Sequence, residues 1–289
     1  MTSLSAVIPV AGLGTRSLPA SKSVPKEMLP VFDRPIIQYI VEEAVTSGAK
    51  NIVLVTSRGK SIIEDHFDIA PDLEATLKRA NKNDLYKLVH DLSRMTAVQT
   101  VRQKEALGLG HAVWMAKNLI QTSPFGVMLG DDLVEAKVPG LQQLLEKSKS
   151  LKKDVSEIGV VMLTEVPDSE VSKYGICELD PKEPGRILRC IEKPKPSDTK
   201  SRSAILGRYL LPRDIFEILE KQKPGNLGEI QLTDALNVLA EQGRLYGCYL
   251  QGLRFDAGDR LGFLRANLHY YLKSPLKSDV QNLLKEFMA

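Results

Sequence analysis

The sequence has few cysteines and no pattern that would pair them. Three occur in 289 residues, Cys177, Cys190 and Cys248, and no two form a C-x-x-C pair. An odd number of scattered cysteines argues against a disulfide framework and against a zinc site. Unpaired thiols are typical of a reducing compartment, so we expect a cytoplasmic protein.

Long apolar runs and a strong net charge are also missing. No apolar run approaches the roughly 20 residues that cross a bilayer, and the first residues do not read as a signal peptide. The formal net charge is only +3, and the basic residues are spread along the chain. We therefore expect neither a nucleic acid nor a membrane as partner. No Ser/His/Asp or Cys/His set is evident for nucleophilic catalysis.

What the chain does contain is a glycine loop directly after its first expected strand. The apolar residues 6–10 are followed by A-G-L-G-T-R at positions 11–16. Glycine lets a ligand approach backbone N–H groups closely, and successive N–H groups in such a turn bind anions. Arg16, Lys22 and Lys26 follow within one short segment and would neutralise a polyphosphate. The pattern indicates a nucleoside triphosphate site.

Two better-known phosphate loops fit the sequence less well. The dinucleotide fingerprint G-x-G-x-x-G needs a third small residue that leads into a helix, but here Ser17 is followed by prolines at 19 and 25. The segment Gly59-Lys60-Ser61 lacks the first glycine of a P-loop, a place taken by Leu54. We interpret this segment as a strand-to-helix turn, with Lys60 in solvent and Ser57 as a candidate helix cap.

Apolar runs and helical patterns alternate along the chain. Strands are expected at 6–10, 51–56, 97–101, 126–129, 158–163, 175–179, 187–191, 204–211 and 246–250. Helices are expected at 36–46, 61–67, 110–120, 141–148, 215–220, 230–241, 261–272 and 276–288, with one or two charged surface helices in 72–95. This alternation predicts an α/β fold, with a Rossmann-like, mixed, mostly parallel central sheet flanked by helices.

The whole chain is expected to form one domain built around one sheet. We expect residues 1–156 to build the nucleotide side, 157–260 the acceptor side, and 261–289 the C-terminal helices. Ligands of open α/β sheets bind outside the carboxyl ends of the strands. The N-terminal loop, Asp131 and Asp256 each follow an expected strand, so we expect them to converge there.

Two aspartates lie in short segments that also contain glycine. Gly130-Asp131-Asp132 follows the strand at 126–129, and Asp256 lies within R-F-D-A-G-D at 254–259. Magnesium prefers oxygen ligands and commonly binds one or two carboxylates together with substrate phosphates. Gly-Asp pairs also favour plain turns, which is the alternative for each segment alone. Together with the loop, the two aspartates predict a Mg²⁺ site.

Two further segments follow strands and carry polar groups. In Glu192-Lys193-Pro194, the glutamate can accept hydrogen bonds from sugar hydroxyls and the lysine can meet a phosphate, although a solvated strand end is the simpler interpretation. Gln103 precedes L-G-L-G-H at 107–111, and its amide offers the donor and acceptor that suit the imide edge of a pyrimidine. We expect His111 to be structural.

These segments together resemble the sugar-1-phosphate nucleotidyltransferases, in their uridylyl branch. The matching motifs span nearly the whole chain in the right order: A-G-L-G-T-R at 11–16, P-K-E-M-L-P at 25–30, Q-Y-I-V-E-E at 38–43, E-D-H-F-D at 64–68, Q-K-E-A-L-G-L-G-H-A at 103–112, L-G-D-D at 129–132, E-K-P at 192–194, G-E-I-Q-L-T-D-A at 228–235 and F-D-A-G-D at 255–259. One departure is Ser21, where the family usually has threonine, and this change keeps the hydroxyl.

The resemblance implies a nucleotide-diphospho-sugar transferase fold and transfer of UMP from UTP to α-D-glucose 1-phosphate. It also implies a homodimer or homotetramer. By the same resemblance, each site residue has a role: Ala11, Gly12, Gln103 and Gly108 hold the uracil; Gly14, Thr15, Arg16 and Lys26 bind phosphates; Asp131 and Asp256 carry Mg²⁺; Gly175, Glu192 and Glu229 face the glucose; Lys193 meets its phosphate.

The chemistry of the substrates indicates which residues would be catalytic. A phosphate monoester has a second pKa of about 6, so the attacking oxygen is already anionic and needs no general base. Catalysis then depends on charge and positioning. We expect Lys26 and Lys193 to offset charge and Arg16 to hold the leaving pyrophosphate. Two alternatives stay open: a thymidylyltransferase, since uracil and thymine differ by one methyl, and a catalytically weak regulator that binds UDP-glucose.

Overall fold

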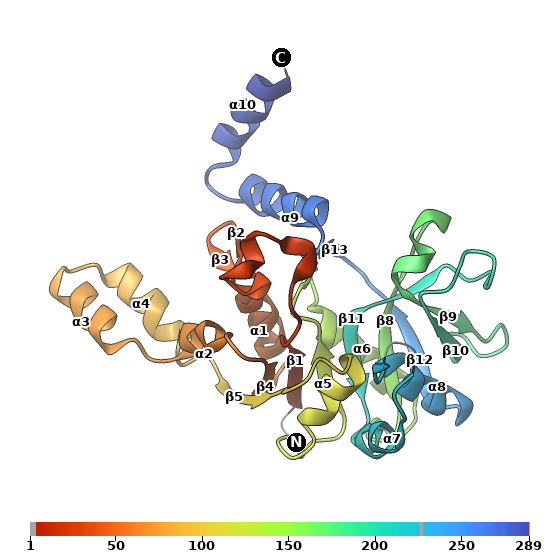
Figure 1. Cartoon of the computed structure of the whole chain (residues 1–289). Coiled ribbons are helices and arrows are strands. Elements are labelled where there is room, and N and C mark those ends of the chain that lie inside the picture. The colour runs from red at the N-terminus through yellow and green to blue at the C-terminus, as the bar shows by residue number, and fades with distance from the viewer. Residues whose placement is uncertain (1–3, 226–227, 289) are drawn as a thin grey trace.

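A mixed sheet of nine strands forms the centre of the molecule (Figure 1). The computed structural model describes residues 4–225 and 228–288. The strands run in the order β10-β9-β11-β6-β1-β4-β5, and β8 joins β11 to β12. The expected α/β architecture, a mixed central sheet flanked by helices, is therefore confirmed.

The sheet is parallel on the side of the N-terminal strand. This part consists of β1 (Leu4–Pro9), β4 (Ala49–Thr56), β5 (Ala97–Arg102) and β6 (Phe125–Met128). β1 lies between β4 and β6 and is parallel to both. Ala6, Val7 and Ile8 are fully buried, as expected for a central parallel strand covered on both faces.

The other side of the sheet is built around one long antiparallel strand. This strand, β11 (Ser203–Leu211), is buried along its whole length. It pairs antiparallel with β6, with β8 (Gly159–Glu165) and with β9 (Gly175–Leu179). β10 (Ile187–Glu192) continues this side antiparallel to β9, and β12 (Leu245–Tyr249) is parallel to β8.

Helices cover both faces of the sheet and divide the core into two layers. α1 (Ile36–Thr46) and α6 (Gly140–Ser150) pack on one face, and α5 (Leu109–Met115), α7 (Ile215–Lys221) and α8 (Leu232–Glu241) pack on the other. Along β1, Ala6 and Ile8 belong to the first layer and Val7 to the second, because neighbouring side chains of a strand point to opposite faces.

Several helices lie outside these two layers. α2 (Ser61–Phe67) leads into a hairpin of α3 (Pro71–Arg79) and α4 (Asn83–Leu92), which projects from the sheet (Figure 1). α9 (Arg260–Lys273) packs near the N-terminal loop, and α10 (Lys277–Met288) contacts α9 and points away from the body. Among the described residues, no helix combines the length and apolar character of a membrane span.

Most expected elements are confirmed to within a few residues, but the smallest ones were not predicted. These are β7 (Asp132–Glu135), which pairs antiparallel with β13 (Leu253–Asp256), and the pair β2 (Pro30–Val31) and β3 (Arg34–Pro35). Short 3₁₀ turns also follow the N-terminal loop: η1 (Thr15–Ser17), η2 (Ala20–Lys22) and η3 (Lys26–Met28). Asp256 was expected to follow the strand at 246–250; it instead ends β13, because that segment pairs with β7.

Candidate active site

A cleft of about 850 Å³ opens at the carboxyl ends of β1, β5 and β6. Every residue that the sequence predicted for the site lines this cleft: Ala11, Gly12, Gly14, Thr15, Arg16, Lys26, Gln103, Gly108, Asp131, Gly175, Glu192, Lys193, Glu229 and Asp256. Lys22, which the sequence grouped with the other cations, is exposed on η2 and does not line the cleft. The fold therefore brings together residues that are up to about 245 positions apart in sequence.

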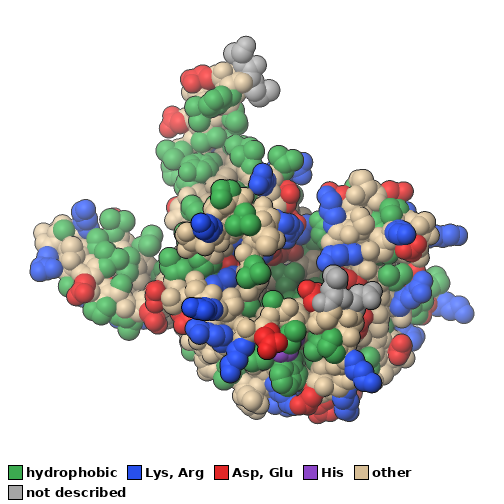
Figure 2. Space-filling view, in the orientation of Figure 1, with side chains coloured by type: hydrophobic (Ala, Val, Ile, Leu, Met, Phe, Trp, Pro, Cys, Tyr) green, Lys and Arg blue, Asp and Glu red, His purple; other side chains and the backbone are tan. Residues whose placement is uncertain are grey.

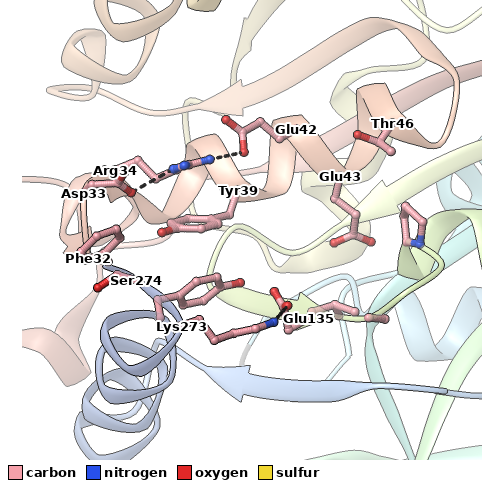
Figure 3. A pocket seen from close by; sticks show the side chains of 14 residues that line it. Phe32, Asp33, Arg34, Tyr39, Glu42, Glu43, Thr46, Glu135, Lys273 and Ser274 are labelled. Carbon is pink, nitrogen blue, oxygen red and sulfur yellow. Dashed lines mark hydrogen bonds and ion pairs between the residues drawn. The ribbon is translucent and has the colours of Figure 1, made fainter. Parts of the chain in front are cut away.

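A second, smaller pocket of about 390 Å³ lies between α1, β7 and α9 (Figure 3). Its cations already have partners: Arg34 pairs with Asp33 at 3.1 Å and with Glu42 at 2.8 Å, and Lys273 pairs with Glu135. Its lining carries four carboxylates against two cations, the opposite of what a polyphosphate requires: Asp33, Glu42, Glu43 and Glu135, with Arg34 and Lys273. We therefore assign the candidate site to the larger cleft.

The glycine loop at the mouth of the cleft is held by a side chain from the next turn. Gly14 has a φ of +66°, and its carbonyl oxygen accepts a hydrogen bond of 2.7 Å from the Ser21 hydroxyl. A Cβ atom at Gly14 would lie 3.2 Å from the Ser21 Cβ and 3.5 Å from the Lys26 side chain. Position 21 therefore needs a hydroxyl, which serine supplies as well as threonine.

Asp131 lies directly after β6 and faces two of the predicted phosphate-binding cations. Its Oδ2 atom is 2.5 Å from the Lys26 Nζ and 3.5 Å from the Arg16 guanidinium. Burial raises the pKa of Asp131, but the charges and hydrogen bond of these neighbours outweigh burial and leave the pKa below its ordinary value. Asp131 is therefore a carboxylate at neutral pH.

Asp256 approaches the same point from β13. Its Oδ2 atom is 3.8 Å from Arg16 and 3.5 Å from Arg254. A Cβ atom built on Gly258 would lie 2.6 Å from Asp131 Oδ2 and 3.1 Å from Asp256 Oδ1, so both carboxylates border this glycine. Burial raises the pKa of Asp256, which means that this carboxylate gains from a further positive charge.

The two aspartates form a donor set that fits a small hard cation. Within residues 4–225 and 228–288, no group of three or more His, Cys, Asp or Glu side chains is arranged around a metal position. Magnesium commonly takes one or two carboxylates and completes its octahedron with phosphate oxygens and water. The pair of Asp131 and Asp256, in a cleft lined by a phosphate-type loop, matches that chemistry.

The structure also assigns a supporting role to residues that the sequence did not single out. Asp132, next to Asp131, accepts hydrogen bonds from the backbone N–H of Gly207 at 2.8 Å and from the Arg254 Nε at 2.5 Å. Arg254 also donates to the Tyr174 hydroxyl at 2.8 Å. The side chain of Asp132 is thus committed to β11 and β13, which leaves Asp131 to face the cleft.

A fully buried arginine reinforces this support. Arg208 on β11 pairs with Glu43 at 2.8 Å and donates to the backbone carbonyl of Asp132 at 2.6 Å. A buried charge is tolerated when it is paired and hydrogen-bonded. The sequence does carry a signal for this residue, because Arg208 is the single charge within the strand S-A-I-L-G-R-Y-L-L at 203–211.

The predicted sugar-facing residues meet on β9, β10 and α8. Gly175 and Glu192 are direct partners in the β9–β10 ladder, and Glu192 Oε2 accepts a 2.6 Å hydrogen bond from the Thr233 hydroxyl. Lys193 has a φ of +46°, donates its backbone N–H to the Tyr174 carbonyl at 3.0 Å and keeps its side chain 60% exposed. Left-handed backbone at a residue other than glycine costs energy and is concentrated at functional sites.

The predicted pyrimidine-facing residues lie on the loops that follow β1 and β5. The Gln103 amide nitrogen lies 3.2 Å from the Gly108 carbonyl oxygen and 2.9 Å from the His111 Nδ1. His111 thus orients Gln103, in agreement with the structural role expected for it. The segment at 107–110 exchanges two backbone hydrogen bonds of 2.8 and 2.9 Å with Ile230, the neighbour of Glu229.

One expectation about this region is wrong. Lys60 was expected in solvent, but it is only 7% exposed and its ammonium group contacts Glu27 and the carbonyl of Val10. Ser57 does not cap α2, because Lys60 occupies the cap position and no side chain bonds there. The reason is that the turn before α2 packs against the end of β1, a contact between distant segments.

Comparison with known proteins bears on what this cleft is. A family model described as nucleotidyl transferase matches residues 5–271. The chain belongs to the nucleotidyl transferase family. Among named relatives of this nucleotidyltransferase, the UTP–glucose-1-phosphate uridylyltransferase of Bacillus subtilis (strain 168) is 44% identical over 285 residues, covering 98% of this chain and 95% of the relative.

Solved structures of similar proteins agree with this family. A UTP-bound UGPase from Acinetobacter baumannii superposes on the nucleotidyltransferase with a TM-score of 0.87 at 39% identity, covering 99% of both chains. A UDP-glucose pyrophosphorylase complexed with UDP-glucose has a TM-score of 0.83 at 38% identity, covering 94% of this chain and all of the other. The chain is thus a nucleotidyltransferase, an enzyme, over its full described length.

Proposed function

We propose that this nucleotidyltransferase transfers UMP from UTP to α-D-glucose 1-phosphate, giving UDP-glucose and pyrophosphate. The observation that carries the proposal is the single cleft that places the pair of Asp131 and Asp256 beside Arg16 and Lys26, with Lys193 in the same lining. The names of the relatives at 38–44% identity support uridine and glucose as the specific substrates.

The reaction is an in-line displacement at the α-phosphorus of UTP. An oxygen of the sugar phosphate forms the new P–O bond, while the bond from the α-phosphorus to the bridging oxygen of the β-phosphate breaks and pyrophosphate leaves. The attacking oxygen is already ionised at neutral pH, so no general base is required. The remaining barrier is repulsion between anions and the ordering of two substrates.

The basic side chains of the cleft act on these two difficulties. Lys26, which already lies against Asp131, offsets charge that builds up at the α-phosphate, and Arg16 holds the leaving pyrophosphate. Lys193 pairs with the phosphate of the sugar. The backbone of Lys193 is held in place by its hydrogen bond to the Tyr174 carbonyl. Backbone N–H groups of Gly14 and Thr15 complete the phosphate site.

A divalent cation, for which we propose Mg²⁺, completes the charge balance. Asp131 and Asp256 would hold it, because their carboxylates border the same point of the cleft. When bound, it neutralises phosphate oxygens and polarises the reacting phosphoryl group. Lys26 and Arg16 keep both aspartates next to positive charge, which lets two carboxylates stay close together.

The walls of the cleft would select the base and the sugar. We assign the uracil to Ala11, Gly12, Gln103 and Gly108, and the glucose hydroxyls to Gly175, Glu192 and Glu229. On this assignment residues 1–156 act as the nucleotide-binding half and 157–260 as the sugar-binding half. The segment pairing between 107–110 and Ile230 then joins the two halves directly behind the substrates.

The function is tested by pyrophosphate release from glucose 1-phosphate and each of UTP, dTTP, CTP and ATP. We expect release with UTP that needs Mg²⁺ and stops with a chelator. Comparable release with dTTP would favour a thymidylyltransferase, and binding of UDP-glucose without turnover would favour a regulator. Asp131→Asn should abolish the metal-dependent rate, while Asp154→Asn on the exposed surface should not; an unchanged metal titration for Asp131→Asn would refute the metal site.

We further propose a homodimer or homotetramer in the cytoplasm. Hydrophobic side chains gather along α9 and α10, where the chain leaves the body (Figure 2). Leu264, Leu283 and Phe287 are 51%, 50% and 84% exposed, and exposed apolar clusters of this kind are typical of protein interfaces. The free thiols of Cys177, Cys190 and Cys248 support a reducing compartment.

A further inference from the structure

A buried ion pair lies directly behind the phosphate-binding side of the cleft. The ammonium group of Lys60 is 2.9 and 3.1 Å from the two carboxylate oxygens of Glu27 and also donates to the carbonyl of Val10. Glu27 is 1% exposed and Lys60 is 7% exposed. Lys60 is the lysine of the P-loop-like segment 59–61, a motif that the cleft itself does not use.

The pair joins the segments that carry the reacting charges. Val10 immediately precedes the glycine loop, and its N–H is anchored to the Val55 carbonyl at 2.9 Å. Glu27 immediately follows Lys26 in η3. A Cβ atom on Gly130, the neighbour of Asp131, would lie 2.9 Å from the Val10 side chain and 3.3 Å from Glu27. The segments that contain Val10, Glu27 and Gly130 thus pack together at this point. Lys60 links the first two, through a hydrogen bond to the Val10 carbonyl and an ion pair with Glu27.

The charge of Lys60 also determines what Glu27 can attract. Burial raises the pKa of Glu27, while the positive charges of Lys60 and then of Lys26 lower it. If Lys60 is lost, an uncompensated buried carboxylate remains, a situation that is strongly unfavourable. Lys26 is then the remaining lysine whose charge acts on Glu27, and its ammonium group would be drawn away from Asp131 and from the substrate.

We infer that Lys60 is a positioning residue for the transfer reaction: by neutralising Glu27 and binding the Val10 carbonyl, it keeps Lys26 directed at Asp131 and the triphosphate. This inference rests on the proposed function, because that function makes Lys26 the group that meets the α-phosphate. Lys60 itself touches no substrate, because Glu27 and Val10 lie between it and the cleft.

The test is a double-mutant cycle with Lys60→Met, Glu27→Gln and the double variant. Lys60→Met should lower kcat by about 10–100-fold, the usual effect of misplacing a catalytic group. The double variant should recover most of that loss, because it removes the carboxylate that competes for Lys26. Rates are expressed per folded enzyme, with folding followed by circular dichroism.

Two controls separate positioning from stability. Leu144→Ala removes a fully buried side chain of α6 and should lower the melting temperature without changing kcat. Lys117→Met removes an exposed pair with Glu220 and should change neither. A purely structural Lys60 would behave like Leu144, with normal kcat in the folded fraction. That result, or a double variant no faster than Lys60→Met, would overturn the inference.

The same mutant cycle can be measured through the affinity for UTP, without turnover. In titration calorimetry without sugar phosphate, Lys60→Met should bind UTP about 10-fold more weakly, and the double variant should recover. If wild-type protein binds UTP but makes no UDP-glucose, the proposed function fails while this cycle still decides the role of Lys60. A different outcome separates the two: the wild type is active, and Lys60→Met has a normal kcat and binds UTP as tightly as the wild type. That outcome would refute the positioning role of Lys60 and leave the proposed function standing.

Discussion

Arg16, Lys26 and Lys193 differ in how firmly the protein holds them. The Lys26 side chain is 17% exposed and lies 2.5 Å from Asp131, so its position is set before any ligand arrives. Arg16 and Lys193 are 63% and 60% exposed, and the contacts of Arg16 with the two aspartates are longer, at 3.5 and 3.8 Å. On the proposed function Lys26 would therefore supply preorganised charge, whereas the other two side chains would adjust to the phosphates.

Removal of Lys26 should separate rate from fold. We expect Lys26→Ala to lower kcat by about 10²–10³, the usual cost of losing one preorganised charge. Secondary structure should stay intact, because Lys26 lies at the cleft surface. Lys22→Ala is the matched control, since Lys22 is exposed four residues away and does not line the cleft. Steady-state kinetics with circular dichroism decide the matter, and near-normal turnover in Lys26→Ala would exclude the assigned role.

A histidine outside the cleft should make stability depend on pH. Burial lowers the pKa of His66 below its ordinary value of 6.5, and its Nε2 lies 3.1 Å from the Gln38 side-chain oxygen. The unfolded chain therefore takes up a proton at a higher pH than the folded chain, so the free energy of unfolding falls as pH drops below about 6.5. Urea unfolding of His66→Gln between pH 8 and 5 should show a shallower fall than wild type; parallel curves would contradict this.

At the scale of elements, the loop before α5 and the loop before α8 behave as one unit. Residues 107–110 and Ile230 are joined by backbone hydrogen bonds, and a Cβ atom on Gly108 would lie 2.8 Å from the Ile230 carbonyl oxygen. Gly108 also has a φ of +92°, which favours glycine. Because one loop carries Gln103 and the other Glu229, this close approach would couple the proposed base wall to the proposed sugar wall.

A methyl group at Gly108 should therefore disturb both substrates. Gly108→Ala should raise the KM for UTP and for glucose 1-phosphate, each by about 10-fold or more. Gly48→Ala is the matched control: Gly48 has a similar φ of +95° but nothing within 4 Å of its Cβ position. Gly48→Ala should lose about 1–2 kcal/mol from backbone strain, and Gly108→Ala should lose more, because its φ of 92° and ψ of 175° are almost confined to glycine and its Cβ would meet the Ile230 carbonyl. If Gly108→Ala resembles Gly48→Ala in its KM values, the coupling of the two walls is absent.

At the scale of the whole molecule, the cleft follows from where the two parts of the sheet meet. β6 leads into Asp131 and Asp132 on the parallel side, and β11 lies beside β6 and begins the antiparallel side. Arg208 and Gly207 of β11 hold Asp132, so the antiparallel side fixes a residue of the parallel side. Asp131 thus follows a strand of the core and Asp256 ends β13, while Lys26 lies on η3, Arg16 on η1 and Lys193 directly after β10.

The C-terminal helices should determine assembly. α10 contacts α9 and carries exposed Leu283 and Phe287 away from the body, an arrangement that a second copy would cover (Figure 1). Deletion of residues 277–289 should reduce the mass measured by size exclusion with light scattering, to the monomer or to half of the original assembly. The activity per chain should fall less than twofold, because the cleft lies elsewhere. An unchanged mass would refute this role of the C-terminal helices.

The order of the elements and the residues of the cleft could both be predicted from the sequence. Local patterns are sufficient for these: apolar runs identify buried strands such as Ala6–Ile8, and the positions of Asp131 and Glu192 after strands place them at the sheet edge. The motifs that resemble the family supplied the specific roles, which stay predictions until they are measured. Short strands such as β7 and β13 were missed because each has only two apolar residues among its four, whereas β6 is equally short but is buried along its whole length.

Only the tertiary structure decided which charged side chains pair with one another beside the cleft. Lys60 meets Glu27 from 33 positions away, and Arg254 meets Asp132 from 122 positions away. In sequence Lys60 resembles a solvated lysine after a strand, and nothing marks Asp132 as the partner of Arg254. The physical reason is that the environment of a charged side chain, its burial and its partner, is set by segments that meet only when the chain folds. Apolar periodicity is a local property, whereas the pairing of a buried charge is not.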